Sequence, residues 1–180
     1  KTYPPLKEMI IHRDFLTIEK PFENKFTIVG NFPYNISSQI LFKILEWKVD
    51  VECVIGMFQK EVAQRIKAKE GNKTYGVLSV LMQAFFEVQY LFAVSPGSFT
   101  TPPKVKSAVI RLFPVKNPLP LRSEKEFFLL VKTAFNQRRK ILRNAVKNLF
   151  DAAILEDELF NKRPEQLSVQ DFATLTFKMK

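Results

Sequence analysis

Apolar residues occur in short, dense runs along the first part of the chain and at helical spacing along its C-terminal part. Dense apolar runs between polar loops are typical of β-strands, and the almost continuous run 52–58 indicates a strand covered on both faces. The predicted strands are residues 9–12, 26–30, 52–58, 87–94 and 107–113, the last two as antiparallel neighbours. Helical spacing predicts helices over 60–69 and 77–86, and one from Ser37, with Ser37 or Ser38 as its N-cap. Strands and helices in this order indicate an α/β fold.

Three prolines between residues 114 and 120 mark a change in this pattern, and such a segment is typical of a linker. Beyond it, the apolar spacing predicts helices over 124–135, 138–150 and 169–177, with a turn near 155–160 and Ser168 as the last N-cap. We therefore expect an α/β part, residues 1–116, followed by a small all-α part, residues 117–180.

The chain carries a formal net charge of +10 and has a pI near 9.7. A basic balance favours nucleic acid or an anionic surface as partner, although a soluble basic protein without such a partner has the same composition. The densest basic cluster consists of Arg138, Arg139, Lys140, Arg143 and Lys147, with no acid among them. On one helix, residues 139, 143 and 147 share a face, which is either a solvated surface or a phosphate-binding surface. Arg65, Lys67 and Lys69 are weaker candidates.

The remaining composition favours no redox, metal or membrane chemistry. Cys53 lies in an apolar run and has no cysteine partner, so we expect it to pack as a small hydrophobic residue. His12 has no histidine or cysteine partners, and we therefore expect no metal site. No apolar stretch reaches the ~20 residues that cross a bilayer, and the start lacks a signal peptide pattern. We expect a cytoplasmic protein with no membrane partner.

A stiff polar turn follows the apolar run 26–30. Asn31 offers a side-chain carbonyl oxygen, and the main-chain carbonyl of Phe32 follows it, while Pro33 restricts the backbone on both sides. Two fixed acceptors suit a planar amino group such as that of adenine, and Tyr34 adds a ring on which a base can stack. On these residues alone, a plain strand-to-helix turn is an equal alternative.

The stretch Asn-Phe-Pro-Tyr-Asn-Ile-Ser, residues 31–37, closely resembles the Asn-Leu-Pro-Tyr-Asn-Ile-Ser motif of the small-subunit rRNA adenine dimethyltransferases. The resemblance extends over nearly the whole chain and includes long motifs in the same order. They are residues 58–62 (Phe-Gln-Lys-Glu-Val), 75–80 (Tyr-Gly-Val-Leu-Ser-Val), 98–109, 135–140 (Phe-Asn-Gln-Arg-Arg-Lys) and 163–168 (Arg-Pro-Glu-Gln-Leu-Ser).

This resemblance implies transfer of methyl groups from S-adenosylmethionine to the 6-amino groups of two adjacent adenines near the 3′ end of 16S rRNA, in the 30S subunit or its precursor. Asn31 and Phe32 would hold the amine, Pro33 would fix the turn, and Tyr34 would stack on the base. Phe99 matches the position that closes the other face of the base, and its alternative role is a loop anchor in the core. The adenine must leave its own helix or loop to reach such a pocket.

The resemblance also implies a partial Rossmann-like S-adenosylmethionine methyltransferase domain followed by the helical, RNA-contacting domain. Asp14 and Phe15 match a pair of residues that contacts the cofactor in this family, and Asn31 is a further cofactor contact. Taken alone, Asp14 is typical of an ordinary turn residue. The sequence holds five glycines and none forms the Gly-rich turn of this fold. We therefore expect that the first strands and most of the cofactor site lie upstream of Lys1, and that this chain alone is poorly active. Thr101 replaces the usual proline in the loop of Phe99.

Two other functions remain open at this point. One is a non-catalytic rRNA-binding or ribosome-assembly module, and the other is a related amino-methylating enzyme that acts on DNA or large-subunit rRNA. The Gln-Arg-Arg-Lys stretch, residues 137–140, and the tail favour the small-subunit branch.

Overall fold

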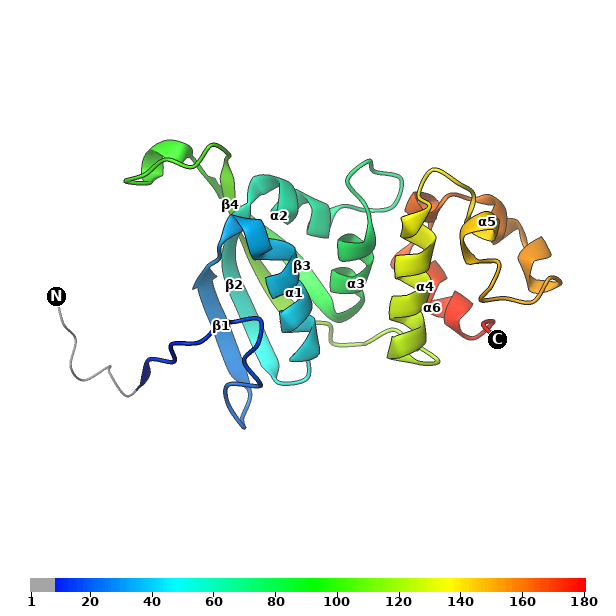
Figure 1. Ribbon diagram of the computed structural model, residues 1–180, viewed down its shortest axis with the longest axis horizontal. Coiled ribbons are helices and arrows are strands. Elements are labelled where there is room, and N and C mark those ends of the chain that lie inside the picture. Colours follow the sequence, from blue (N-terminus) through cyan, green and yellow to red (C-terminus); the bar gives the residue numbers. More distant parts are fainter. Residues whose placement is uncertain (1–8) are drawn as a thin grey trace.

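The computed structural model describes residues 9–180 and places four strands in one sheet (Figure 1). The strands are β1 Phe26–Asn31, β2 Val51–Gln59, β3 Phe86–Val94 and β4 Ser107–Pro114, in the order β1-β2-β4-β3. β1 and β2 are parallel, while β4 is antiparallel to both β2 and β3. The predicted antiparallel pairing of the last two strands is therefore confirmed.

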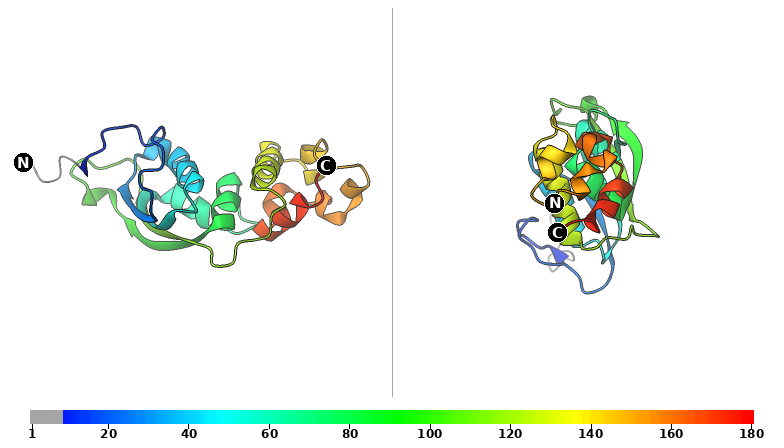
Figure 2. Two further views of the ribbon diagram at one scale, coloured as in Figure 1. Left: turned by 90° about the horizontal axis from the view of Figure 1, so that it is seen from below. Right: turned by 90° about the vertical axis from the view of Figure 1, so that its right-hand side faces the viewer.

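Three helices pack on one face of the sheet, as Figure 2 shows from two further directions. They are α1 Ser37–Glu46, α2 Lys60–Lys67 and α3 Val77–Phe85. The face under them carries the buried residues of β2 and β4, including Val54, Phe58 and Ile110. On the opposite face Val29 of β1 is 74% exposed. Within residues 9–180 the sheet is thus covered on one face, and the expectation that β2 is covered on both is not met.

The C-terminal part is helical and contains α4 Glu124–Asn136, α5 Leu142–Val146 and α6 Val169–Thr176, with 3-10 turns at Ile154–Glu156, Glu158–Asn161 and Pro164–Gln166. It packs against α3 and the preceding loop, where Tyr75 meets Phe135 and Phe85 meets Phe127, with ring centroids 6.1 and 6.3 Å apart. One continuous apolar cluster runs through both parts. The division at residue 116 stays a prediction.

The strand predicted over residues 9–12 is wrong. Residues 10–12 form no regular structure, and Ile10 and Ile11 are 67% and 55% exposed. A strand needs a neighbour that accepts and donates its backbone hydrogen bonds, and no described strand pairs with this segment. Short apolar runs carry no information about such a neighbour.

The helix predicted over residues 138–150 is also wrong, because only Leu142–Val146 is helical. Helix α4 ends at Asn136, and the chain then turns so that the N–H of Leu142 donates to the carbonyl of Lys162 at 2.8 Å. A second turn follows, in which the N–H of Leu149 donates to the carbonyl of Val146 at 2.8 Å. Tertiary contacts therefore interrupt a stretch whose composition favours a helix.

The two predicted N-caps have different outcomes. Ser168 caps α6 through a reciprocal capping box with Asp171, as predicted. Ser37 caps nothing, because a 3-10 turn over Tyr34–Ile36 precedes α1 and makes Ser37 its first residue. Its hydroxyl instead donates to the carbonyls of Pro33 and Tyr34, at 3.2 and 3.1 Å. Among the described residues, no helix is both long and apolar enough to cross a membrane.

Candidate active site

The turn of Asn31 to Tyr34 lies where β1 ends and the chain leaves the sheet toward α1. Asn31 pairs with Met57 of β2, and the N–H of Phe32 donates to the Met57 carbonyl at 3.2 Å. Pro33 has φ −59° and ψ 131°, which is extended backbone, and the 3-10 turn begins at Tyr34. The last sheet hydrogen bond and the proline ring therefore fix the backbone of Phe32 from both sides.

The side chains of the turn point to different places. The ring of Phe32 is 8% exposed and stacks on Phe58 with centroids 5.0 Å apart, so it belongs to the core. Asn31 is exposed, and no described residue hydrogen-bonds its side-chain amide. The Tyr34 hydroxyl shares a hydrogen bond with the Ser107 hydroxyl, which is buried at the start of β4. The turn thus presents an unengaged amide beside a ring held in place by β4.

The loop that carries Phe99 forms the other wall of the same pocket. This pocket has a volume of about 310 Å³ and is lined by Asn31, Phe32, Pro33, Tyr34, Phe99, Thr101 and Pro103. Phe99 follows a 3-10 turn, Pro96–Ser98, and is not part of the buried core, so the alternative role as a core anchor is not supported. The structure therefore brings together the two aromatic residues that sequence placed 65 positions apart.

Phe15 approaches the turn through aromatic contacts, and Asp14 precedes it in the chain. The ring of Phe15 lies edge-on to Phe32 and to Trp47, with centroids 6.1 and 5.3 Å apart. Asp14 forms a local turn, in which its Oδ1 accepts from the N–H of Leu16 at 2.9 Å. Asp14 can therefore be a turn residue and still contact a cofactor. The single hydrogen bond to Oδ1 leaves the exposed carboxylate able to accept further hydrogen bonds.

These residues fit one end of an S-adenosylmethionine site by their chemistry. Asp14 and Asn31 supply acceptors for amine donors, and the Phe15 ring supplies an apolar face. The glycines are used elsewhere: Gly30 and Gly56 lie under the ring of Phe32, and Gly71 has the positive φ of a tight turn. Within residues 9–180, no group of three His, Cys, Asp or Glu side chains is arranged to hold a metal ion.

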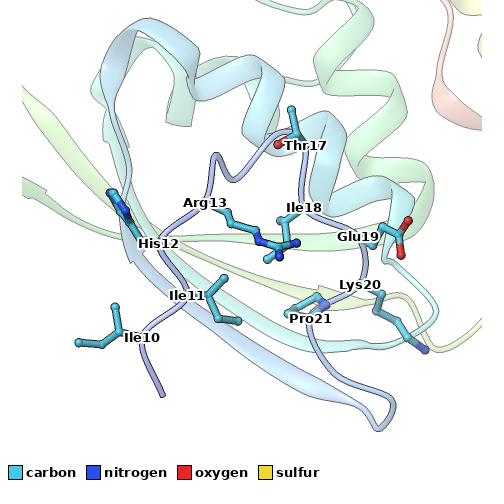
Figure 3. A pocket seen from close by; sticks show the side chains of 9 residues that line it. All are labelled: Ile10, Ile11, His12, Arg13, Thr17, Ile18, Glu19, Lys20 and Pro21. Atoms are coloured by element: carbon cyan, nitrogen blue, oxygen red, sulfur yellow. The ribbon is translucent and has the colours of Figure 1, made fainter. Parts of the chain in front are cut away.

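A larger pocket of about 700 Å³ lies in the loop that also carries Asp14 and Phe15. It is lined by nine residues of the segment 10–21, including His12, Arg13, Glu19 and Lys20, and none of the predicted site residues reaches it. Figure 3 shows that these side chains come from one curved loop beside β1. The pocket between the turn and the Phe99 loop is the better candidate active site, because it joins an amide, a fixed carbonyl and two rings from two separate segments.

The five predicted RNA-binding residues do not form one surface. Arg138 donates to the Lys73 carbonyl at 2.7 Å and lies 3.8 Å from Glu165, so it ties the loop before α3 to the tail. Arg143 lies 3.9 Å from Glu156. Arg139, Lys140 and Lys147 are exposed, and no described acid pairs with them. The shared helical face of 139, 143 and 147 is wrong, because residue 139 precedes the start of α5.

Arg65, Lys67 and Lys69, the weaker basic candidates, differ in whether an acid pairs with them. Arg65 pairs with Glu61 at 2.7 Å, which partly neutralises it, whereas Lys67 and Lys69 have no acidic partner among the described residues.

Burial raises the pKa of the Cys53 thiol, and the nearby Arg111 only partly offsets this rise. Because a nucleophilic cysteine needs a lowered pKa, Cys53 fits the structural role expected from sequence.

Sequence reasoning missed one residue of the site and one residue of the core. Ser107 holds the Tyr34 hydroxyl, and its signal was a hydroxyl residue at the start of an apolar run. Tyr75 is fully buried, and burial together with Glu70 and Asp171 raises its pKa far above the usual range. Tyr75 therefore stays neutral and acts as a packing residue where the two parts of the chain meet.

The sequence model of the family described as "Ribosomal RNA adenine dimethylase" matches residues 3–176. Proteins named "Ribosomal RNA small subunit methyltransferase A" from Cytophaga hutchinsonii and Flavobacterium johnsoniae are each 54% identical to this chain. Each alignment covers 98% of this chain and 69% of the relative.

Two solved structures of methyltransferases are also similar to this chain. The structure of a dimethyladenosine transferase from Plasmodium falciparum superposes with a TM-score of 0.77 at 25% identity, covering 92% of this chain and 70% of the other. The 23S rRNA methyltransferase ErmE superposes with a TM-score of 0.62 at 26% identity, covering 91% of this chain and 71% of the other. The mixed sheet with its helices is thus the fold of Rossmann-like methyltransferases.

Proposed function

Because the chain belongs to the ribosomal RNA adenine dimethylase family, we propose that its pocket between Tyr34 and Phe99 holds an adenine of small-subunit rRNA during methylation. Members of this family dimethylate adenine in rRNA and take the methyl groups from S-adenosylmethionine. The observation that carries the proposal is the shared pocket of the turn and the Phe99 loop. We infer two adjacent adenines near the 3′ end of 16S rRNA as the target, and the 30S subunit or its precursor as the partner.

The turn supplies two acceptors for the two N–H bonds of the 6-amino group. The Asn31 side-chain oxygen would accept one and the Phe32 carbonyl the other, which draws the nitrogen lone pair out of conjugation with the ring. Tyr34 and Phe99 would hold the extruded base between their rings, and stacking of this kind contributes roughly 1–3 kcal/mol per base. Catalysis then rests on positioning and on fixed dipoles.

Asp14, Phe15 and Asn31 are the residues of this chain that would hold the methyl donor. Bound S-adenosylmethionine supplies an electrophilic methyl group on a sulfonium. Asn31 and Phe32 would hold the amine nitrogen toward this methyl group, and the amine would release its proton to solvent after the transfer. Among residues 9–180, no imidazole or carboxylate lines the pocket as a general base.

The exposed cations Arg139, Lys140 and Lys147 are the part of the basic cluster left for rRNA phosphates, because Arg138 and Arg143 have partners within the chain.

The family match favours methylation over a purely non-catalytic rRNA-binding module. The relatives that are 54% identical act, by their names, on the small subunit, which favours that branch over the large-subunit branch. The cytoplasmic location remains a prediction.

The proposal is tested by methyl transfer from labelled S-adenosylmethionine to small ribosomal subunits that lack the modification, using the protein that contains this chain. Asn31→Ala is expected to lower kcat by about 10²- to 10³-fold, the usual effect of removing one fixed polar contact to a reacting group. Its Tm should not change, because no described residue hydrogen-bonds the Asn31 side chain.

Asn24→Ala is the matched control, because Asn24 is an exposed loop amide away from the pocket. Label found on adenine N6 with the wild-type protein, together with the loss at Asn31 alone, supports the proposal. Full activity of Asn31→Ala, or label on another atom of the rRNA, would contradict it.

A further inference from the structure

Two glycines open a slot beneath the turn. Gly30 of β1 and Gly56 of β2 are direct neighbours in the sheet register. The Phe32 ring folds back over them, so that a Cβ at Gly30 would lie 2.6 Å from its Cζ and a Cβ at Gly56 would lie 2.7 Å from its Cε2. Carbon atoms that are not bonded to each other do not approach so closely. The Phe32 ring can therefore pack over each of these positions only because glycine has no side chain.

The slot is closed by two more aromatic rings. Phe58 stacks on the Phe32 ring with centroids 5.0 Å apart, and a Cβ at Gly56 would also lie 2.6 Å from Phe58. Phe15 meets the Phe32 ring edge-on at 6.1 Å. A methyl group added at Gly56 thus has no flexible neighbour to displace, because both rings it would meet are buried.

The backbone of Phe32 follows its ring. The N–H is held by the Met57 carbonyl at 3.2 Å, the ring lies in the slot, and Pro33 begins directly after the carbonyl. A shift of the ring must therefore move the carbonyl that is proposed to accept the adenine amine. Gly56 is the informative position, because it stands on a different strand and can be changed without altering the chain of the turn.

We propose that Gly56 is a positioning residue for methyl transfer, which acts by fixing the Phe32 ring and hence the Phe32 carbonyl. This inference rests on the proposed function. A purely structural role predicts a loss of stability alone. A positioning role predicts, in addition, a lower kcat of the folded protein with little change in the KM for the ribosomal subunit, because the carbonyl acts on the reacting amine rather than on the rest of the rRNA.

The test compares the wild-type protein with Gly56→Ala, Phe32→Leu and the double variant Phe32→Leu/Gly56→Ala. Gly76→Ala is the control, because a Cβ there meets no atom within 4 Å. Thermal unfolding gives the folded fraction at the assay temperature, and kcat and KM are measured on unmodified small subunits. Gly56→Ala is expected to lower kcat by about 10- to 100-fold, the range for a small misplacement of a reacting group.

The double variant decides between the two roles. Leucine vacates part of the slot and the alanine methyl refills it, so the double variant should exceed Phe32→Leu in kcat by about fivefold through direct coupling of the two sites. This comparison holds even if Gly56→Ala does not fold. A kcat of folded Gly56→Ala equal to wild type, or a double variant no better than Phe32→Leu, would overturn the inference. A wild-type protein without methyl transfer would contradict the proposed function instead.

Discussion

The turn at Asn31 and the basic segment 138–147 differ in what holds them. The turn is held by apolar packing and a proline, with the Phe32 ring buried and Pro33 fixing the backbone. The basic segment is held by charged contacts, since Arg138 reaches the Lys73 carbonyl and Glu165, while Arg143 reaches Glu156. The packed turn leaves the Asn31 amide free for a substrate, whereas a segment held by its own charges has fewer charges left to bind RNA.

After Asn31→Ala, the largest effect that sharpens this comparison is expected at Tyr34. Tyr34→Ala removes the stacking ring, and a loss of roughly 1–3 kcal/mol corresponds to about a 5- to 150-fold fall in kcat/KM. Tyr34→Phe is the matched control, because it keeps the ring and removes only the hydrogen bond to Ser107. Steady-state kinetics on unmodified small subunits give both values. Equal losses in the two variants would show that the hydroxyl, and not the ring, is what matters.

The next effect is expected from the exposed cations of the basic segment. Arg139→Ala/Lys140→Ala should weaken rRNA binding by about tenfold and reduce the slope of log affinity against log salt by one to two, as for lost phosphate contacts. Binding is measured over a salt series. Lys25→Ala/Lys116→Ala lowers the net charge equally at exposed positions elsewhere. If this control weakens binding as strongly, the segment acts only through overall charge.

A smaller and different effect is expected at Arg138. Arg138→Ala removes a charged hydrogen bond to the Lys73 carbonyl and should cost about 1 kcal/mol in the free energy of unfolding. Urea unfolding measures this loss, and Arg139→Ala is the comparison, because Arg139 has no described partner. Weaker RNA binding at unchanged stability would instead place Arg138 among the phosphate contacts.

The smallest effect concerns pH and separates the two regions. The hydrogen bond from Lys178, followed by that from the Leu159 N–H, lowers the pKa of Asp157 in the helical part. A lowered folded-state pKa gives stability that is present above the usual aspartate pKa and is lost as the pH falls through the folded value. Acid should therefore loosen the helical part, and Asp157→Asn should flatten that dependence. Hydrogen exchange at acidic pH would show it, and equal loosening around Phe32 would contradict it.

Much of the α/β part was predictable, because its elements are short and their signals are local. The apolar run 52–58 predicted β2 within one residue at each end. In the helical part, Ser168 was predicted as the N-cap of α6, and the structure confirms it. The failures came where a partner decides the outcome. Residues 10–12 lack a neighbouring strand among those described, and residues 138–150 are bent by contacts with the tail.

The candidate site divides in the same way. The sequence alone determined the turn, because Asn31, Pro33 and Tyr34 are adjacent and proline restricts the backbone wherever it occurs. It also determined the family, through motifs along nearly the whole chain. Only the tertiary structure decided that Ser107 holds Tyr34, that Gly30 and Gly56 make room for the Phe32 ring, and that Arg138 is engaged within the chain. These features depend on distances between strands and loops far apart in sequence, which local propensity does not specify.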